Sequence, residues 1–264
     1  MTSPEDAPDI SEQFRRSMRA LTALPDLDMR VASIGRQLQA LPPEDAVWWL
    51  GQTMRGALWG VQASMDGMLA TAMWLLRTPV DDIYGWCQQL YAVAHAQGRR
   101  EIMFLLRDAP PHKALGEGAR LPEVRLPMSR DVSLGERRQM ARAARGDLLD
   151  RLLQDPSPLV LEKLLENTTL RPERVLLVAS RRPTRAELLD VVALHRSWIV
   201  HHDIREALVM NPFARTGVAL KLMGTLNIKI LRRLRDTGDL HPSVSELASM
   251  LVELREERTA PLRV

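Results

Sequence analysis

Apolar residues recur three and four positions apart along most of the chain, and no stretch alternates apolar and polar residues as a strand would. This spacing places the apolar side chains on one face of a helix. Prolines and acidic residues at segment starts are typical of helix N-termini. We therefore predict an all-α protein. In the second half the expected helices are 134–145, 147–154, 158–166, 172–181, 185–194, 199–210, 214–225, 227–235 and 243–256.

Three residue pairs in the second half have the spacing of a capping box. In this arrangement a hydroxyl accepts a hydrogen bond from the third amide of the helix, and a glutamate at that position accepts one from the cap amide. The three expected capping boxes are Ser133/Glu136, Thr184/Glu187 and Ser243/Glu246.

A segment rich in proline and glycine separates two helical regions. Between Asp108 and Asp131 there are four prolines and two glycines, a composition typical of a linker or a surface strap. We expect an N-terminal helical bundle at 10–107, a linker or strap at 108–131, and a second helical domain at 132–256.

The second helical region contains a weak internal repeat with a period of 44 residues. Aligning 160–180 with 204–224 gives five identities in twenty-one pairs, among them Leu164/Leu208 and Asn167/Asn211. A period of this length, made of short leucine-rich helices, is typical of α-solenoids. The asparagines recur at helix ends, where they can cap backbone groups or, alternatively, grip the backbone of a bound peptide.

Five short segments carry a resemblance to a known class: 134–138 (LGERR), 147–156 (DLLDRLLQDP), 164–167 (LLEN), 178–183 (VASRRP) and 207–212 (ALVMNP). Together they resemble bacterial HEAT-like or leucine-rich-variant helical repeat proteins, in particular a δ-proteobacterial (myxobacterial) group, over about 133–240. The resemblance implies a HEAT-like, right-handed α-solenoid used for protein contacts, with no catalytic residues. Some leucine-rich-variant proteins hold an iron–sulfur cluster on a cysteine-rich segment; Cys87 is the only cysteine here, so no cofactor is expected.

The composition of the chain indicates in which cellular compartment the protein resides. A single cysteine permits neither an intrachain disulfide nor a cysteine zinc site. The first nine residues are acidic and lack the layout of a secretion signal. The uncharged stretch 67–76 is about half of the roughly 20 residues that cross a bilayer. We expect a cytoplasmic protein without a membrane span.

Basic residues are concentrated in the repeat region. From Arg171 to Arg235 there are thirteen Lys and Arg against five Asp and Glu, whereas the whole chain has a net charge of +3. An acidic protein surface is one partner that this excess fits, nucleic acid is another, and a solvated outer face is the plain structural explanation. The candidate partner-binding residues here are Arg171, Arg174, Arg181, Arg182 and Arg185.

A second candidate surface lies in the N-terminal region. Five of the six tryptophans fall between Trp48 and Trp86, close to several methionines. Such a segment can be an adaptable partner groove or an ordinary core. Trp48 and Trp49 are neighbours on a helix and cannot both face inward, so we include both as candidates and expect one to be exposed.

The sequence contains few candidate catalytic or metal-binding residues. His195, His201, His202 and Asp203 form a histidine-rich segment, in which His202 and Asp203 superficially resemble a metal-binding pair. Neighbouring helix positions diverge by about 100°, so a metal would need ligands from other helices. We expect a helix start with exposed histidines and no metal site. No phosphate loop, nucleophile elbow or paired-carboxylate motif occurs. The sequence therefore favours a non-enzymatic adaptor or scaffold that binds another protein, with a nucleic-acid-binding HEAT-like protein using 171–235 as the alternative.

Overall fold

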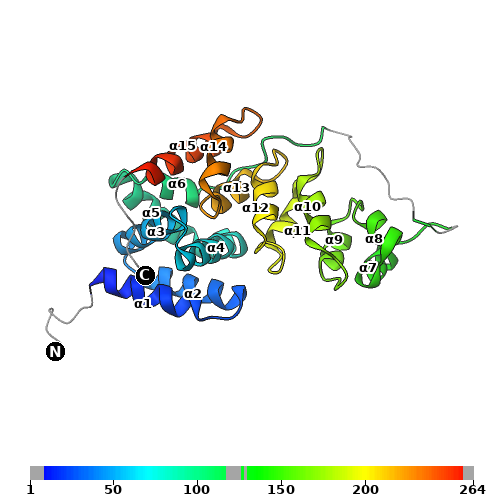
Figure 1. The fold of residues 1–264 in the computed structure, drawn as a ribbon, viewed down its shortest axis with the longest axis horizontal. Coiled ribbons are helices and arrows are strands. Elements are labelled where there is room, and N and C mark those ends of the chain that lie inside the picture. Colours follow the sequence, from blue (N-terminus) through cyan, green and yellow to red (C-terminus); the bar gives the residue numbers. More distant parts are fainter. Residues whose placement is uncertain (1–8, 117–125, 128–129, 258–264) are drawn as a thin grey trace. The chain divides into compact units, whose positions relative to one another are not determined.

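The computed structural model describes residues 9–116, 126–127 and 130–257. Within these residues every regular element is a helix, and Pro111 and Arg215 form an isolated β-bridge (Figure 1). The all-α fold class is confirmed. The helices are α1 Ile10–Thr22, α2 Leu27–Ala40, α3 Pro43–Leu58, α4 Gln62–Arg77, α5 Val80–Ala96, α6 Arg100–Leu106, α7 Leu134–Ala143, α8 Gly146–Leu152, α9 Pro158–Leu165, α10 Pro172–Ser180, α11 Ala186–Leu194, α12 His202–Val209, α13 Thr216–Met223, α14 Ile228–Asp236 and α15 Pro242–Glu256.

The nine helices expected after residue 132 are all present as α7 to α15, and no end differs from its expected position by more than three residues. Proline occupies the first position of α9 and α10, where its missing N–H costs nothing. None of the helices among the described residues is both long enough and apolar enough to cross a membrane.

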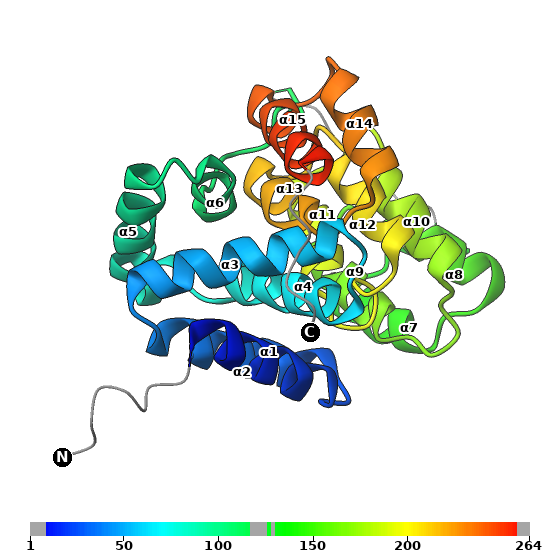
Figure 2. The same ribbon diagram turned by 60° about the vertical axis from the view of Figure 1, so that its left-hand side comes forward.

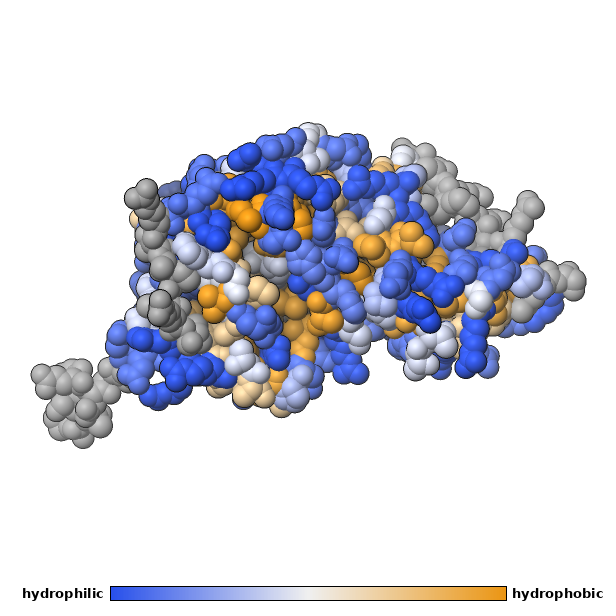
Figure 3. Space-filling view, in the orientation of Figure 1, coloured by the Kyte–Doolittle hydropathy of each residue, from blue (hydrophilic) through white to orange (hydrophobic). Residues whose placement is uncertain are grey.

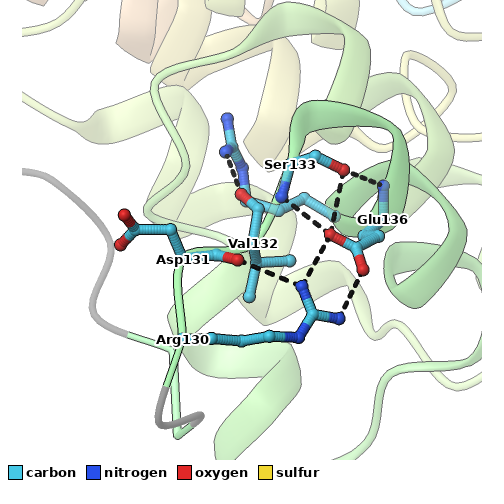
Figure 4. A network of polar contacts seen from close by, with 6 residues as sticks. Arg130, Asp131, Val132, Ser133 and Glu136 are labelled. Carbon is cyan, nitrogen blue, oxygen red and sulfur yellow. Dashed lines mark hydrogen bonds and ion pairs between the residues drawn. The ribbon is translucent and has the colours of Figure 1, made fainter.

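One of the three expected capping boxes is confirmed, at the start of α7. The hydroxyl of Ser133 accepts from the Glu136 amide at 3.3 Å, and Glu136 accepts from the Ser133 amide at 2.9 Å. Arg130 donates to the same carboxylate, as Figure 4 shows. These contacts, that of Arg130 above all, lower the pKa of Glu136 to about 2.

The other two capping boxes are wrong. Helix α11 begins after Arg185, which caps it without a side-chain bond, while Thr184 is buried one residue earlier. Helix α15 is capped by His241, whose Nδ1 accepts from the Ser243 amide at 3.1 Å. Thr184 thus lies one residue before the N-cap of α11, and Ser243 is the second residue of α15. Neither hydroxyl is at the cap position.

The chain divides into two compact units. Unit 1 comprises the described residues within 1–107, 220–236 and 245–264, and unit 2 those within 108–219 and 237–244. The division points after residues 219 and 244 fall inside α13 and α15. The expected ranges 10–107, 108–131 and 132–256 stay a prediction.

The core of unit 1 is built mainly on α3 and α4, which pack on each other and on α1, α2 and α5 (Figure 2). Aromatic rings meet edge-on at two places. Phe14 of α1 contacts Trp49 at 5.2 Å between ring centroids, and Trp74 contacts Trp86 at 5.0 Å. Most of the Trp- and Met-rich segment is therefore core, with Trp49, Met54, Met68 and Met73 almost fully buried.

In unit 2, α7 packs on α9, α9 on α11, and α10 on α12. The expected repeat has a structural counterpart at the end of α9. The side chain of Asn167 is buried, and its Nδ2 donates to the carbonyl oxygens of Ala141 at 2.9 Å and Ala144 at 3.0 Å, at the end of α7. Its Oδ1 accepts from the Thr169 amide at 2.9 Å. One side chain thus caps an earlier helix and fixes its own turn.

Asn211 repeats these contacts 44 residues later, at the end of α12. Its Nδ2 donates to Ala179 at 2.8 Å and Arg181 at 3.0 Å, at the end of α10, and its Oδ1 accepts from the Phe213 amide at 3.1 Å. Both amide hydrogens are used inside the chain at each site. The capping interpretation is confirmed, and the side chains are not free to grip a bound peptide.

The first part of the Pro/Gly segment is held by hydrogen bonds of unit 2. The Ala109 and Pro110 carbonyls accept from the Gly217 and Thr216 amides at 3.1 and 3.3 Å, and the Lys113 amide donates to Pro212 at 2.8 Å. Residues 109–113 therefore run along 212–217, held by backbone hydrogen bonds. Residues 117–125 and 128–129 of the expected segment lie outside the described part of the chain.

Candidate partner-binding surface

The outer face of α10 carries an exposed leucine. Val175, Val178 and Ala179 define the buried face of this helix. Because a helix turns about 100° per residue, Leu177 lies on the opposite side and Arg174 on the flank of the helix, whereas Arg181 follows the last helical residue. Leu177 is 68 % exposed, the largest exposed fraction among the large apolar residues that the structure describes. Figure 3 shows hydrophobic surface beside hydrophilic residues in the region where Figure 1 labels α10.

Arg174 is bound to its own chain. Its Nε and Nη2 donate to the two carboxylate oxygens of Asp150 at 2.7 and 3.1 Å. Both side chains are substantially exposed, so the pair adds only about 0.2–1 kcal/mol to stability. It also compensates the charge of Arg174 and fixes the guanidinium beside the exposed leucine.

Arg181 and Arg182 each donate a hydrogen bond to a backbone carbonyl at the end of a helix. Arg181 donates to the carbonyl of Leu153, the C-cap of α8, at 2.8 Å, and burial lowers the pKa of its guanidinium. Arg182 donates to the carbonyl of Met210, the C-cap of α12. Cations at helix C-termini satisfy carbonyls that have no partner inside the helix. Both residues therefore have a structural role that the sequence did not reveal.

Arg171 and Arg185 are the two candidates that remain available. They are exposed N-caps of α10 and α11, and neither side chain makes a hydrogen bond or ion pair with any described residue. A cation at a helix N-terminus adds to the positive end of the helix dipole. Two such positions on helices that pack together favour a negatively charged partner group.

The two tryptophan candidates belong to unit 1. Trp49 is 2 % exposed and packs against Phe14, so it is part of the core. Trp48 is half-buried, with its ring 5.8 Å from that of Phe14. Neither tryptophan is therefore fully exposed, contrary to the expectation for one of the two, because both rings pack edge-on against the buried Phe14.

His201 and His202 stand at the start of α12, as expected, but both are half-buried and not exposed. His202, Asp203 and Glu206 place possible ligand atoms within 4.8 Å of one another, all from this one helix. Because one helix supplies all three residues, the expectation that a metal would need ligands from other helices is wrong. The group is exposed at Asp203, and the positive end of the helix dipole disfavours a cation there. These residues could hold a metal only weakly.

Leu177 is the surface residue that sequence reasoning missed. The signal was present, because Leu177 is out of phase with the apolar positions 175, 178 and 179 of the same helix. An apolar residue on the polar side of a short helix is a candidate contact, although single exposed leucines are common.

Comparison with known proteins gives no further constraint. No family model, no curated protein and no solved structure matches this chain. The similarity to HEAT-like and leucine-rich-variant proteins therefore stays an expectation drawn from the sequence.

Proposed function

We propose that the protein is a non-enzymatic adaptor or scaffold that binds an acidic surface of another protein through the helical-repeat region of unit 2. The observation that carries this proposal is the exposed Leu177 on α10, with Arg174 fixed beside it and Arg171 at the start of the same helix. A HEAT-like solenoid is part of the proposal, and the equivalent contacts of Asn167 and Asn211 support it.

The proposed surface has the composition of a protein interface. Binding energy in such interfaces is concentrated in a few apolar or aromatic anchors and arginines, surrounded by polar residues that exclude water. Leu177 supplies the anchor, and Arg171 and Arg185 supply charges that are not engaged within the described chain. A partner with a small apolar pocket rimmed by Asp or Glu fits this chemistry.

Nucleic acid fits less well. Phosphate binding needs several uncompensated cations, because affinity follows the number of phosphates neutralised. Arg174, Arg181, Arg182 and Arg215 all donate to carboxylates or carbonyls of their own unit. Fewer basic side chains are therefore available than the local charge suggests.

The test is affinity capture from a bacterial lysate with and without nuclease. Leu177→Asp and the double reversal Arg171→Glu/Arg185→Glu are compared with Arg19→Glu/Arg36→Glu, a control pair of exposed arginines in unit 1. We expect both test variants to lose a captured protein that the control retains, with no effect of nuclease. Equal capture by all variants would overturn the proposal.

Capture that nuclease abolishes would instead support the alternative. Its salt dependence would then be steep, about 0.9 units of log affinity per log salt for each duplex phosphate neutralised. Binding to an acidic protein surface weakens only moderately over the same range.

A further inference from the structure

Helix α5 presents an outer face that lacks strong charge over most of its length. From Ile83 to Gly98 the sequence contains no Asp, Glu, Lys or Arg. The buried residues of this helix, Ile83, Leu90 and Ala94, face α3 and α6. Figure 2 shows α5 beside these helices, with its other side free of any element of unit 1.

Large side chains are exposed on this face. Val80 is 60 % exposed, Tyr84 56 % and Tyr91 40 %. Tyrosines at positions seven apart lie on the same side of a helix, two turns from each other. A row of this kind, without the lysines and glutamates that usually cover a solvated helix, is typical of a surface that meets another protein.

Small residues occupy the middle of the outer face of α5. Around the helix, Gly85 and Ala92 lie between Gln88 and Gln89, and a Cβ added at Gly85 would meet nothing within 4 Å. Small residues seven positions apart let a second helix approach closely, and long neighbours such as Tyr84 and Tyr91 can then pack along its sides. The geometry fits a helix better than a flat surface.

The two ends of α5 have opposite charge. Asp81 and Asp82 are exposed in the first turn and make no ion pair with any described residue. His95 is exposed in the last turn, and Arg100 follows; Arg100 pairs with Glu246 but its side chain remains 61 % exposed. A guanidinium has five N–H donors, so this arginine can bind a second carboxylate.

We propose that α5 pairs with α5 of a second copy of this chain, antiparallel, about a two-fold axis beside Gln88 and Gln89. An antiparallel pair brings the acidic start of each helix to the basic end of the other, so one surface is complementary to itself. In this register Gly85 faces Ala92 of the second copy, and Asp82 faces His95 of the second copy. A parallel pair would instead place acidic ends together.

The dimer is weak and depends on protein concentration. Helix α5 has 17 residues, a length of about 25 Å. One helix pair of this length buries less than the roughly 1,200–2,000 Å² of stable complexes. The surface belongs to unit 1 and shares no residue with the proposed partner surface on α10, so either proposal can fail without the other.

Crosslinking of single cysteines tests both the contact and its direction. In a Cys87→Ser background, Gln88→Cys places the thiol next to the proposed axis, and Ala96→Cys places it near the helix end. In the antiparallel pair two copies of residue 96 are about 22 Å apart along the helices. With a short bismaleimide we expect a covalent dimer from Gln88→Cys and little from Ala96→Cys alone. Mixing Ala96→Cys with Asp81→Cys should restore crosslinking.

The matched control replaces the two exposed tyrosines of α5 by aspartates and keeps the thiol at residue 88. Tyr84→Asp/Tyr91→Asp, added to Gln88→Cys, should reduce the dimer at least five-fold while the far-UV circular dichroism spectrum stays unchanged, because both side chains are exposed. Equal crosslinking at residues 88 and 96 would show a parallel pair or random collisions, and no crosslinking at residue 88 at any concentration would show that two copies do not meet along α5. Either result would overturn the proposal.

Discussion

Replacement of Asn211 by alanine is the most direct test of the repeat architecture. The side chain donates twice, to Ala179 and Arg181, and accepts once, from the Phe213 amide. A net hydrogen bond contributes about 0.5–1.5 kcal/mol, and a carbonyl left buried without a partner costs more than this. Asn211 is 2 % exposed and Ala179 is fully buried, so water cannot replace the lost donors easily. We expect Asn211→Ala to lower the free energy of unfolding by about 2–4 kcal/mol.

Urea unfolding followed by circular dichroism measures this effect. Asn167→Ala should cost a similar amount, because its contacts are equivalent. Asn227→Ala is the matched control: Asn227 is exposed and its Oδ1 accepts from the Ile230 amide at the start of α14, so its loss should cost only about 1 kcal/mol. Asn211→Asp keeps the acceptor but removes both donors and should be at least as harmful as alanine. A change below about 0.5 kcal/mol in Asn211→Ala would refute the reasoning.

Three further predictions follow from local features. Far-UV circular dichroism should show a strongly helical protein, and substantial sheet would contradict the fold. The pKa of Glu136, lowered to about 2 mainly by Arg130, should rise toward its ordinary value in Arg130→Ala when measured by NMR. Because the folded pKa is depressed, the contribution of this contact is complete above about pH 4.3 and is lost as pH falls toward 2. Gly35→Ala would place a Cβ 2.6 Å from Cδ1 of Trp74, so we expect a loss of about 1–3 kcal/mol in urea unfolding; an unchanged midpoint would show that the indole moves freely.

Local features of the fold could be predicted from the sequence because they depend on neighbouring residues. Proline, hydroxyl and acidic residues limited the helices of the second half to within three residues. The Thr184 cap prediction is wrong because α11 starts one residue later, after Arg185, while the Thr184 side chain is buried, and burial depends on tertiary packing. The grouping of 220–236 with the N-terminal helices likewise depends on packing between segments far apart in the sequence.

The arginine candidates show the same limit. Arg181 and Arg182 stand next to a helix start in the sequence, so a ligand-binding role was a reasonable hypothesis. Their acceptors are carbonyls 28 residues away, Leu153 before them and Met210 after them. No local sequence pattern predicts such a contact. Arg171 and Arg185 have no such partner among the described residues, and only the structure separates the two pairs.

The internal repeat reports on architecture and not on binding. Its shared positions that matter most, Asn167/Asn211 and Leu164/Leu208, are buried in both copies. The exposed Leu177 has Lys221 at the equivalent position, where the ammonium is largely buried and donates to the Arg107 carbonyl at 2.8 Å. A contact surface formed by the repeated positions would recur along the chain, whereas this leucine occurs in one copy. A partner that uses Leu177 therefore recognises one repeat, and its affinity should depend on substitutions in α10 and not on those in α13.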